Sequence, residues 1–511
     1  MTTPPWRRVL VSLAAWAVVA VPMWVVLFTH TSAPMVVAGH DVRVTPTFHG
    51  YAQLRTGPIL PDVRIPTGGH LGVAVDVGKT TATSTSQLIA RYAVIASKPG
   101  PEVRRVRAEV GHLAIDAAVR AAVLGLLPIG LWLLIGESRR RQLRGTPRRR
   151  TAGTVAVVVV LAVVLAEPWH RGPERIQPTE WISLSDAVPE LAIPPELDTI
   201  EIQGGLITRE TRRLVASAFK TYAVSKNFYE AVRQQVPTVA SRFHVAAPEQ
   251  TVGLLVSDRH DNIGMDPVAE AIAHAAGAQV VIDAGDDTST GSSWEAFSLD
   301  SLSDAFAHFP VRLAISGNHD NGTFVSSYLI KMGWTHLEGK PLMPFSGVRI
   351  LGVDDPRSSG LGAWLDETGL SWDQVKQRLA DEVCRLDSAG ERVATVVVHS
   401  ASMALPALER GCTDLVVGGH LHRQVGPERI VGENGKVGYS YTNGTTGGAA
   451  YAFAMGSKLR RNAEVTLITW QDGRPVGLQP VVVNTAGRIE VHRYIQLDLS
   501  PARRGHEVTA R

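Results

Sequence analysis

Three long apolar runs stand out in the first third of the chain. Residues 9–28 and 118–136 each have about the 20 residues that a helix needs to cross a hydrocarbon layer of about 30 Å. A third, shorter run covers residues 152–166 and is followed by Pro168 and Trp169, which suit a helix stop and an interfacial anchor. The pattern predicts three membrane-spanning helices, with a soluble helix as the alternative for the third run.

The distribution of arginine predicts how these helices are oriented. Residues 138–150 contain seven arginines, and a short loop of this kind stays in the cytoplasm. Arg7 and Arg8 then place the N-terminus on the same side, and the chain after Trp169 lies outside. Residues 104–107 carry three arginines that would also lie outside, within a long segment where the charge rule is weak. A cleaved signal peptide is the alternative for the first run, although no clear small-x-small site follows it.

The segments around these runs differ in pattern. Residues 31–112 contain β-branched, alternating stretches punctuated by Gly and Pro, which predicts a small β-rich domain outside the membrane whose role the sequence does not disclose. Within it, Gly78-Lys79-Thr80 is interpreted as a turn, because Val73 stands where a phosphate-binding loop needs its first glycine. The two later spans and the basic loop form residues 113–169. Residues 170–250 are predicted to be a tether followed by a packing helix at 210–236, and residues 499–511 a disordered tail.

From residue 251 the pattern changes to short apolar strands that end in polar residues. Strands are predicted at residues 251–257, 279–283, 311–315, 393–398 and 414–417, with a helix at 266–276 that Asp266 is expected to cap. The polar residues that follow the strands are of metal-ligand type: Asp258, His260, Asp286, Asn318, His399, His420 and His422.

A pair of divalent cations about 4 Å apart explains why these residue types recur. Such a pair needs a bridging carboxylate surrounded by imidazole, amide and carboxylate ligands. Asp258 and His260 are two residues apart, so on a continuing strand they would share one face, as would His420 and His422. Glycines before Asp286, Asn318 and His420 would let the backbone turn tightly, and ligands commonly gather at the carboxyl ends of sheet strands.

In these motifs the chain resembles the calcineurin-like metallophosphoesterase superfamily. The ordered signature of that superfamily is Asp-x-His, Gly-Asp, Gly-Asn-His-Asp/Glu, His and Gly-His-x-His, and each element occurs here in order between residues 250 and 490. The resemblance implies an α/β fold in which a two-sheet sandwich is flanked by helices, within a domain at residues 251–498. It also implies hydrolysis of a phosphoester by a hydroxide that bridges two metals.

Carried over position by position, the resemblance implies two metal sites that share Asp286. One metal would be held by Asp258, His260, Asp286 and His422, and the other by Asp286, Asn318, His399 and His420. Mn²⁺ is the metal most expected, and Fe, Zn²⁺ or Co²⁺ would also suit nitrogen and oxygen ligands. The resemblance further implies that His319, oriented by Asp320, contacts the phosphate and protonates the leaving group. Ser289 departs from the acidic residue or Asn of many relatives, and Asp287 could supply the missing support.

Other polar residues in this region are open to two interpretations. His274, His308 and His336 lack partner motifs and are interpreted as structural. Asp354 and Asp355 could face the cleft or simply end a strand, and the neighbouring Arg357 could meet a substrate phosphate or have no such role. Cys384 and Cys412, the only cysteines, either form a disulfide or remain two buried thiols.

Composition narrows the function classes. A net charge of +3, with arginines concentrated in one stretch, gives no expectation of nucleic-acid binding, and no protein partner can be inferred. We therefore expect a multi-pass membrane phosphoesterase in contact with the lipid bilayer, with its catalytic domain on the extracytoplasmic face. Its substrate would be a lipid, a lipid-linked precursor or a nucleotide. The alternative is a membrane receptor or scaffold that keeps the fold without catalysis.

Overall fold

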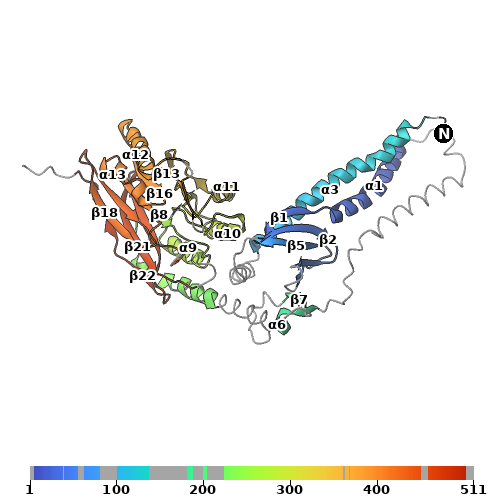
Figure 1. Ribbon diagram of the computed structural model, residues 1–511, viewed down its shortest axis with the longest axis horizontal. Coiled ribbons are helices and arrows are strands. Elements are labelled where there is room, and N and C mark those ends of the chain that lie inside the picture. Colours follow the sequence, from blue (N-terminus) through green and yellow to red (C-terminus); the bar gives the residue numbers. More distant parts are fainter. Residues whose placement is uncertain are drawn as a thin grey trace, which may run out of the picture. The chain divides into compact units, whose positions relative to one another are not determined.

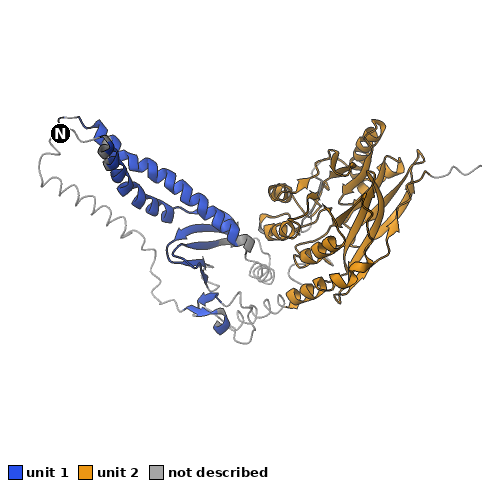
Figure 2. Cartoon of the chain, turned by 180° about the vertical axis from the view of Figure 1, so that it is seen from behind, with its two compact units in different colours: residues 1–81, 99–216 blue, residues 82–98, 217–511 orange. Residues whose placement is uncertain are grey.

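The computed structural model describes residues 5–37, 40–55, 62–80, 100–136, 138, 181–187, 199–203, 224–360, 363–366, 369–449 and 458–501. The chain divides into two compact units (Figure 2). Unit 1 comprises residues 1–81 and 99–216, and unit 2 comprises residues 82–98 and 217–511. Each unit is described by itself.

Two helices of unit 1 are long and apolar enough to cross a membrane. Helix α1 is Pro5–His30 and helix α3 is Gly100–Leu134, and their apolar stretches are Ser12–His30 and Val103–Leu134. These helices correspond to the first two predicted spans. The third predicted span, residues 152–166, lies outside the described residues.

Helices α1 and α3 pack against each other in antiparallel fashion (Figure 1). Trp16 Nε1 donates a hydrogen bond to Ala122 O at 2.9 Å, and Trp24 Nε1 donates to Ala114 O at 3.1 Å. Gly125 permits this close approach, because a Cβ there would lie 2.9 Å from the ring of Trp16. If both helices span the membrane, the antiparallel packing puts the start of α1 and the end of α3 on the same side.

Unit 1 also contains a seven-stranded sheet that draws on two distant parts of the sequence. Five strands come from the predicted β-rich domain, but the other two come from residues that we expected to be an unstructured tether. Val63 on β4 pairs with Ile202 on β7. In spatial order the strands are β1 (Ala33–Val37), β2 (His40–Thr47), β5 (Gly72–Thr80), β3 (Tyr51–Arg55), β4 (Val63–Pro66), β7 (Glu201–Gln203) and β6 (Trp181–Ser183).

The structure corrects two further expectations in this unit. Helix α3 begins at Gly100 rather than near residue 118, because Val106 and Val110 in its first turns pack on the sheet. The three arginines of residues 104–107 therefore belong to the part of α3 that precedes residue 118 and lies near the residues that pack on the sheet. Residues 78–80 end strand β5 rather than forming a turn.

Unit 2 is built on two sheets whose central strands are buried on both faces. The first sheet contains β8 to β11 in parallel, extended by β20, β21 and β22, with β23 on β21; the second has the order β12-β13-β16-β17-β19-β18. A separate hairpin is formed by β14 and β15. The strands are β8 (Gln250–Val256), β9 (Val280–Asp283), β10 (Val311–Ala314), β11 (Thr335–His336), β12 (Leu342–Phe345), β13 (Val348–Val353), β14 (Arg357–Gly360), β15 (Ala363–Asp366), β16 (Val393–Val398), β17 (Thr413–Gly418), β18 (Val425–Val431), β19 (Val437–Thr442), β20 (Ala463–Gln471), β21 (Arg474–Val483), β22 (Ile489–Val491) and β23 (Ile495–Gln496).

Three buried clusters show that the sheets form a sandwich covered by helices. Leu255 from the first sheet and Leu415 from the second belong to one cluster, so the sheets face each other. Leu254, the next residue along β8, belongs to a second cluster with helix residues on the outer side. Successive strand residues point to opposite faces, so the apolar run serves both cores. The first sheet is covered by α9 (Asp266–Ala275), α10 (Ala296–Ala305) and α11 (Phe324–Lys331), and the second by α12 (Trp372–Ser388) and α13 (Leu405–Glu409) (Figure 1).

The remaining predictions for this region have mixed outcomes. All five strands predicted between residues 251 and 417 are present. Residues 224–233 are helical, and Tyr229 is buried in the cluster between the first sheet and its covering helices. The start of the predicted packing helix lies outside the described residues. A disulfide joins Cys384 on α12 to Cys412 before β17, which resolves the two alternatives. The predicted tail is described only up to residue 501.

Candidate metal centre

The predicted ligands gather at the carboxyl edges of both sheets. Asp258, Asp286 and Asn318 follow β8, β9 and β10, which are parallel neighbours in the first sheet. His399 follows β16, and the segment with His420 and His422 follows β17 in the second sheet. Because parallel strands end at the same edge, residues more than a hundred positions apart meet here.

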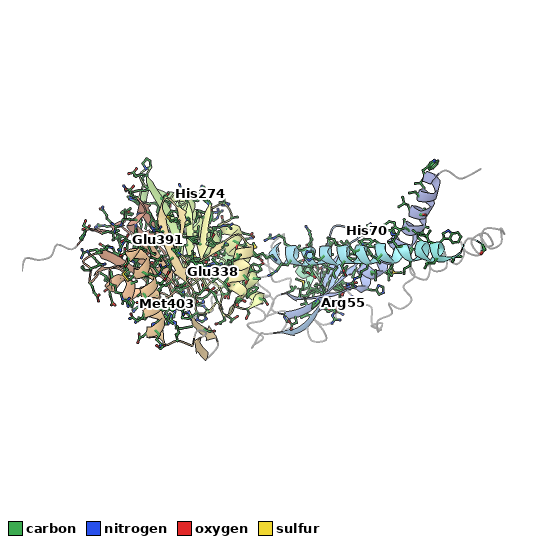
Figure 3. The ribbon with its side chains drawn as sticks, turned by 90° about the horizontal axis from the view of Figure 1, so that it is seen from above. Arg55, His70, His274, Glu338, Glu391 and Met403 are labelled. Carbon is green, nitrogen blue, oxygen red and sulfur yellow. A yellow bond between two sulfur atoms is a disulfide. The ribbon has the colours of Figure 1, made fainter. Side chains whose placement is uncertain are left out.

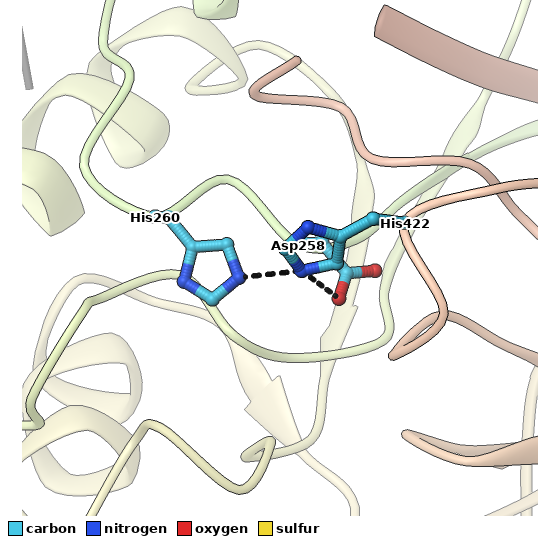
Figure 4. A group of neighbouring side chains, drawn as sticks. All are labelled: Asp258, His260 and His422. Atoms are coloured by element: carbon cyan, nitrogen blue, oxygen red, sulfur yellow. Dashed lines mark hydrogen bonds and ion pairs between the residues drawn. The ribbon is translucent and has the colours of Figure 1, made fainter. Parts of the chain in front are cut away.

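The first group of donor atoms consists of Asp258, His260 and His422 (Figure 4). Nε2 of His260 lies 2.9 Å from Nε2 of His422, and this second nitrogen lies 3.4 Å from Oδ1 of Asp258. Ligands about 2.1 Å from one cation are about 3 Å apart, so these separations match a shared divalent ion.

The second group consists of Asp258, Asp286 and His399. Nε2 of His399 lies 3.1 Å from Oδ2 of Asp286 and 4.0 Å from Oδ1 of Asp258. The two groups share Asp258 rather than Asp286, which the resemblance had implied as the bridge. Asp286 nevertheless reaches toward both, because its Oδ2 is also 3.7 Å from Nε2 of His260.

Two imidazoles are oriented by backbone carbonyls so that their Nε2 atoms face the centre. Nδ1 of His399 donates to Ala284 O at 2.8 Å, and Nδ1 of His422 donates to Ala449 O at 3.0 Å. Nε2 of His399 is fully buried and faces the carboxylates of Asp286 and Asp258. Buried nitrogen and carboxylate donors that converge in this way fit a divalent cation.

The charges in the site also suit cation binding. Burial lowers the pKa of His260 to about 4, so this ring is neutral near pH 7 and has a lone pair to offer. Burial opposes protonation of His399, but the Asp286 carboxylate outweighs it and raises the pKa of His399 to about 10. A cation that bound between them would take the place of that proton.

His420 and Asn318 belong to segments that contact the carboxylates of the centre through backbone N–H groups. The backbone N–H of His420 donates to both oxygens of Asp258, at 2.9 and 3.0 Å. The rings of His420 and His399 lie edge to face, with centroids 5.2 Å apart. Asn318 is buried in the loop after β10, next to His319, whose backbone N–H donates to Oδ1 of Asp286 at 2.8 Å.

The structure corrects the predicted relation between His319 and Asp320. The His319 ring is oriented by the carbonyl of Ser289, to which its Nδ1 donates at 3.1 Å. Asp320 points the other way and accepts hydrogen bonds from the backbone N–H groups of Gly317 and of residues 286–288. Asp320 therefore fixes the loop that carries Asp286, rather than the His319 ring.

The backbone at the site differs from the strand continuation that we expected. Positive φ angles between 46° and 73° occur at five of the predicted ligands: Asp258, His260, Asp286, His420 and His422. The chain therefore leaves each strand in a left-handed turn, which is costly for a residue with a side chain and is found mostly at functional sites. Two of the preceding glycines serve close approach instead of a turn. A Cβ at Gly317 would lie 2.2 Å from Asp286 Oδ1, and one at Gly419 would lie 2.1 Å from Asp258 Oδ2.

A buried arginine that the sequence reasoning missed links the segment after β8 to the loop after β9 and to helix α9. Arg259, between two predicted ligands, is 1% exposed. It donates to Asp287 at 2.9 Å and to Asp266 at 2.7 and 2.9 Å, so Asp266 is an ion-pair partner and not the expected helix cap. Its position in the Asp-x-His motif gave no sign of this role.

Ser289 is held by a second buried group, formed by Asp261 and Glu295. Its N–H donates to both carboxylates, at 3.1 and 2.9 Å, and its hydroxyl donates to Asp261 at 2.6 Å. These contacts fix the carbonyl that orients His319. The Ser at this position, which departs from many relatives, thus has a defined structural role.

The three histidines interpreted as structural belong to neither of the two donor groups found among the described residues. His274 is exposed on α9 (Figure 3), and His308 approaches Glu270 at 3.5 Å. His336 is nearly buried and lies 3.3 Å from both Asp354 and the Ser316 hydroxyl.

Comparison with known proteins defines no family for this chain. No protein-family model and no curated protein matches it. Among solved structures it is similar to a sulfate thiohydrolase, SoxB, from "Termus thermophilus", solved in complex with glycerol. The sequence identity is 16% and the TM-score is 0.29, over 46% of this chain and 44% of the SoxB chain. The chain thus spans less than half of that relative, and so weak a likeness carries no functional argument.

Proposed function

We propose that the protein is a membrane-anchored, metal-dependent phosphoesterase that acts on the extracytoplasmic side. The observation that carries this proposal is the convergence of Asp258, His260, Asp286, His399 and His422, with donor atoms within 4.8 Å in each of two groups. The groups share a carboxylate, which is the arrangement that a pair of divalent cations requires.

The chemistry is divided between bound cations and the chain's own residues. Two divalent cations would lower the pKa of water and neutralise charge on the phosphoryl oxygens. His260, His399 and His422 would hold the cations through Nε2, together with the carboxylates of Asp258 and Asp286. His319, whose Nδ1 is tied to Ser289 O, donates a proton to the leaving-group oxygen.

The proposed side follows from the arginine-rich loop at residues 138–150, and two structural features are consistent with it. Strands β4 and β7 pair, so in a membrane-anchored chain residues 63–66 and 201–203 would lie on the same side. Helix α3 separates them in sequence, so if it spans, the chain between residues 134 and 181 must cross again, and the apolar run at 152–166 is the segment suited to this. The disulfide between Cys384 and Cys412 is the second feature, because disulfides persist in oxidising compartments.

The catalytic proposal is tested with full-length protein purified in detergent and loaded with Mn²⁺. A chromogenic phosphomonoester or phosphodiester should be hydrolysed, and Asp286→Asn should abolish the activity. Asp472→Asn is the matched control, since Asp472 is exposed in the turn between β20 and β21. Metal-loaded protein that is inert on lipid, lipid-linked, nucleotide and chromogenic phosphoesters would favour the receptor or scaffold alternative instead.

The location is tested separately with reporter fusions. Alkaline phosphatase, which is active only outside the cytoplasm, is fused after residue 501, and green fluorescent protein is fused there in a parallel chain. We expect an active phosphatase fusion and a dark fluorescent fusion. The opposite pair of results would place unit 2 in the cytoplasm and contradict the proposed side.

A further inference from the structure

Arg357, at the start of β14, is held in a fixed position by its neighbours. Its Nε donates to Oδ1 of Asp355 at 2.8 Å, and its backbone N–H donates to the same oxygen at 2.9 Å. Its guanidinium also lies over the ring of Trp372, 4.1 Å from the centroid. The side chain is 14% exposed, so it is largely enclosed but still reaches solvent. A guanidinium held by a carboxylate and an aromatic face is ready to bind an anion with little loss of entropy.

Three observations place the segment that carries Arg357 at the sheet edge where the metal centre lies. Strand β13 pairs with β16 in parallel, with Val353 opposite Val398, so the Asp355 segment and His399 leave the sheet at the same edge. The backbone N–H of Asp355 donates at 3.0 Å to Ser316 O, just before Gly317 and Asn318. The Ser358 hydroxyl contacts the side chain of Asn321, in the loop that follows His319 and Asp320.

We propose that Arg357 binds a phosphoryl oxygen of the substrate and favours phosphate monoesters over diesters; this inference rests on the phosphoesterase function proposed above. A monoester has three unsubstituted phosphoryl oxygens, whereas a diester has two. Two divalent cations can each neutralise one oxygen, so only a monoester leaves a third oxygen for a separate cationic group. Nε and Nη2 of Arg357 both donate to Asp355, which fixes the plane of the guanidinium, and a further N–H group of this cation would donate a charge-assisted hydrogen bond to the third oxygen.

A purely structural arginine would behave differently. In that case Arg357 would only keep Asp355 in place against Ser316, and its loss would lower stability without changing selectivity. The test therefore includes binding of inorganic phosphate, which does not depend on turnover. Arg357→Ala and Arg357→Lys are compared with Arg385→Gln, an exposed arginine on α12 that pairs with Glu382.

The experiment uses full-length protein in detergent with equal Mn²⁺ content in each variant. Calorimetric titration measures phosphate affinity, and steady-state kinetics measure KM and kcat for a nitrophenyl phosphate and a bis-nitrophenyl phosphate. Arg357→Ala should weaken phosphate binding and raise the monoester KM by about 10- to 100-fold, as for loss of a charged hydrogen bond. Arg357→Lys should recover part of the affinity, while the diester KM and the Arg385→Gln variant stay unchanged.

The outcomes separate this inference from the proposed function. Unchanged phosphate affinity and monoester KM in Arg357→Ala would overturn the role of Arg357. An equal rise in KM for both esters would overturn the monoester preference. If the wild-type protein hydrolyses neither ester, the proposed function fails, and the phosphate titration still decides whether Arg357 binds the anion. If Arg357→Ala does not fold, Arg357→Lys gives the same decision through its phosphate affinity.

Discussion

Replacing Gly419 with alanine would test whether the position of one carboxylate governs metal binding. The φ angle of Gly419 lies outside the left-handed region, so the backbone accepts a side chain without strain. The added Cβ would lie 2.1 Å from Oδ2 of Asp258 and 2.6 Å from the Ser257 hydroxyl. Because ordinary contact begins near 3.4 Å, the Asp258 carboxylate must move by more than about 1 Å in a closely packed interior.

The expected loss of stability and of Mn²⁺ affinity follows from the interactions that Asp258 makes. Both of its oxygens accept from the His420 N–H, and it belongs to both donor groups. Losing the hydrogen bonds should reduce the free energy of unfolding by about 1–3 kcal/mol. Displacing a ligand common to both groups should weaken Mn²⁺ binding by at least the roughly 10- to 100-fold that is typical of a lost supporting contact.

The assay is calorimetric titration of Mn²⁺ into metal-free protein, together with thermal unfolding. Gly69→Ala is the matched control, since it adds the same methyl group where no atom lies within 4 Å and φ is ordinary. We expect the control to bind and melt like the wild type. If the Gly419→Ala variant bound Mn²⁺ with wild-type affinity and unfolded at the wild-type midpoint temperature, the idea that Asp258 must occupy its observed position would be refuted.

Two further predictions concern stability. Replacing both Cys384 and Cys412 with alanine should cost about 3–4 kcal/mol in the chain-entropy model, because the disulfide closes a 28-residue separation. Urea unfolding measures this, and two titratable thiols in non-reduced wild-type protein would contradict it. The second prediction concerns pH: burial raises the pKa of Glu464, although its hydrogen bond with Tyr441 opposes this. The folded protein then keeps a proton that the unfolded chain loses above about pH 4.3, so this contribution to stability declines as pH rises through the raised pKa. Glu464→Gln should therefore gain stability relative to wild type as the pH rises above about 4.3 in thermal melts, and identical pH profiles would show that Glu464 is not responsible.

Several long-range interactions could not be predicted from the sequence. In unit 1, strands β6 and β7 have three residues each, which is too few to show a periodicity. They form because β7 pairs with the edge of β4, where Arg64 meets Glu201 across a sequence separation of 137 residues. Arg259 could equally have been a surface residue, since its burial depends on carboxylates from α9 and from the loop after β9. The role expected for Asp320 failed for the same reason: adjacency in sequence did not determine which groups its oxygens would meet.

The sequence by itself determined the location of the strands and of the ligand-type residues after them, because apolar runs and polar strand ends are local patterns. It likewise determined two helices that are long and apolar enough to cross a membrane, because length and apolar composition are also local patterns. Only the tertiary structure decided that Asp258 reaches both donor groups, that Ser289 orients His319 and that Cys384 meets Cys412. Each of these depends on the distance between atoms of separate strands and helices, which the packing of the two sheets sets and which no local pattern encodes.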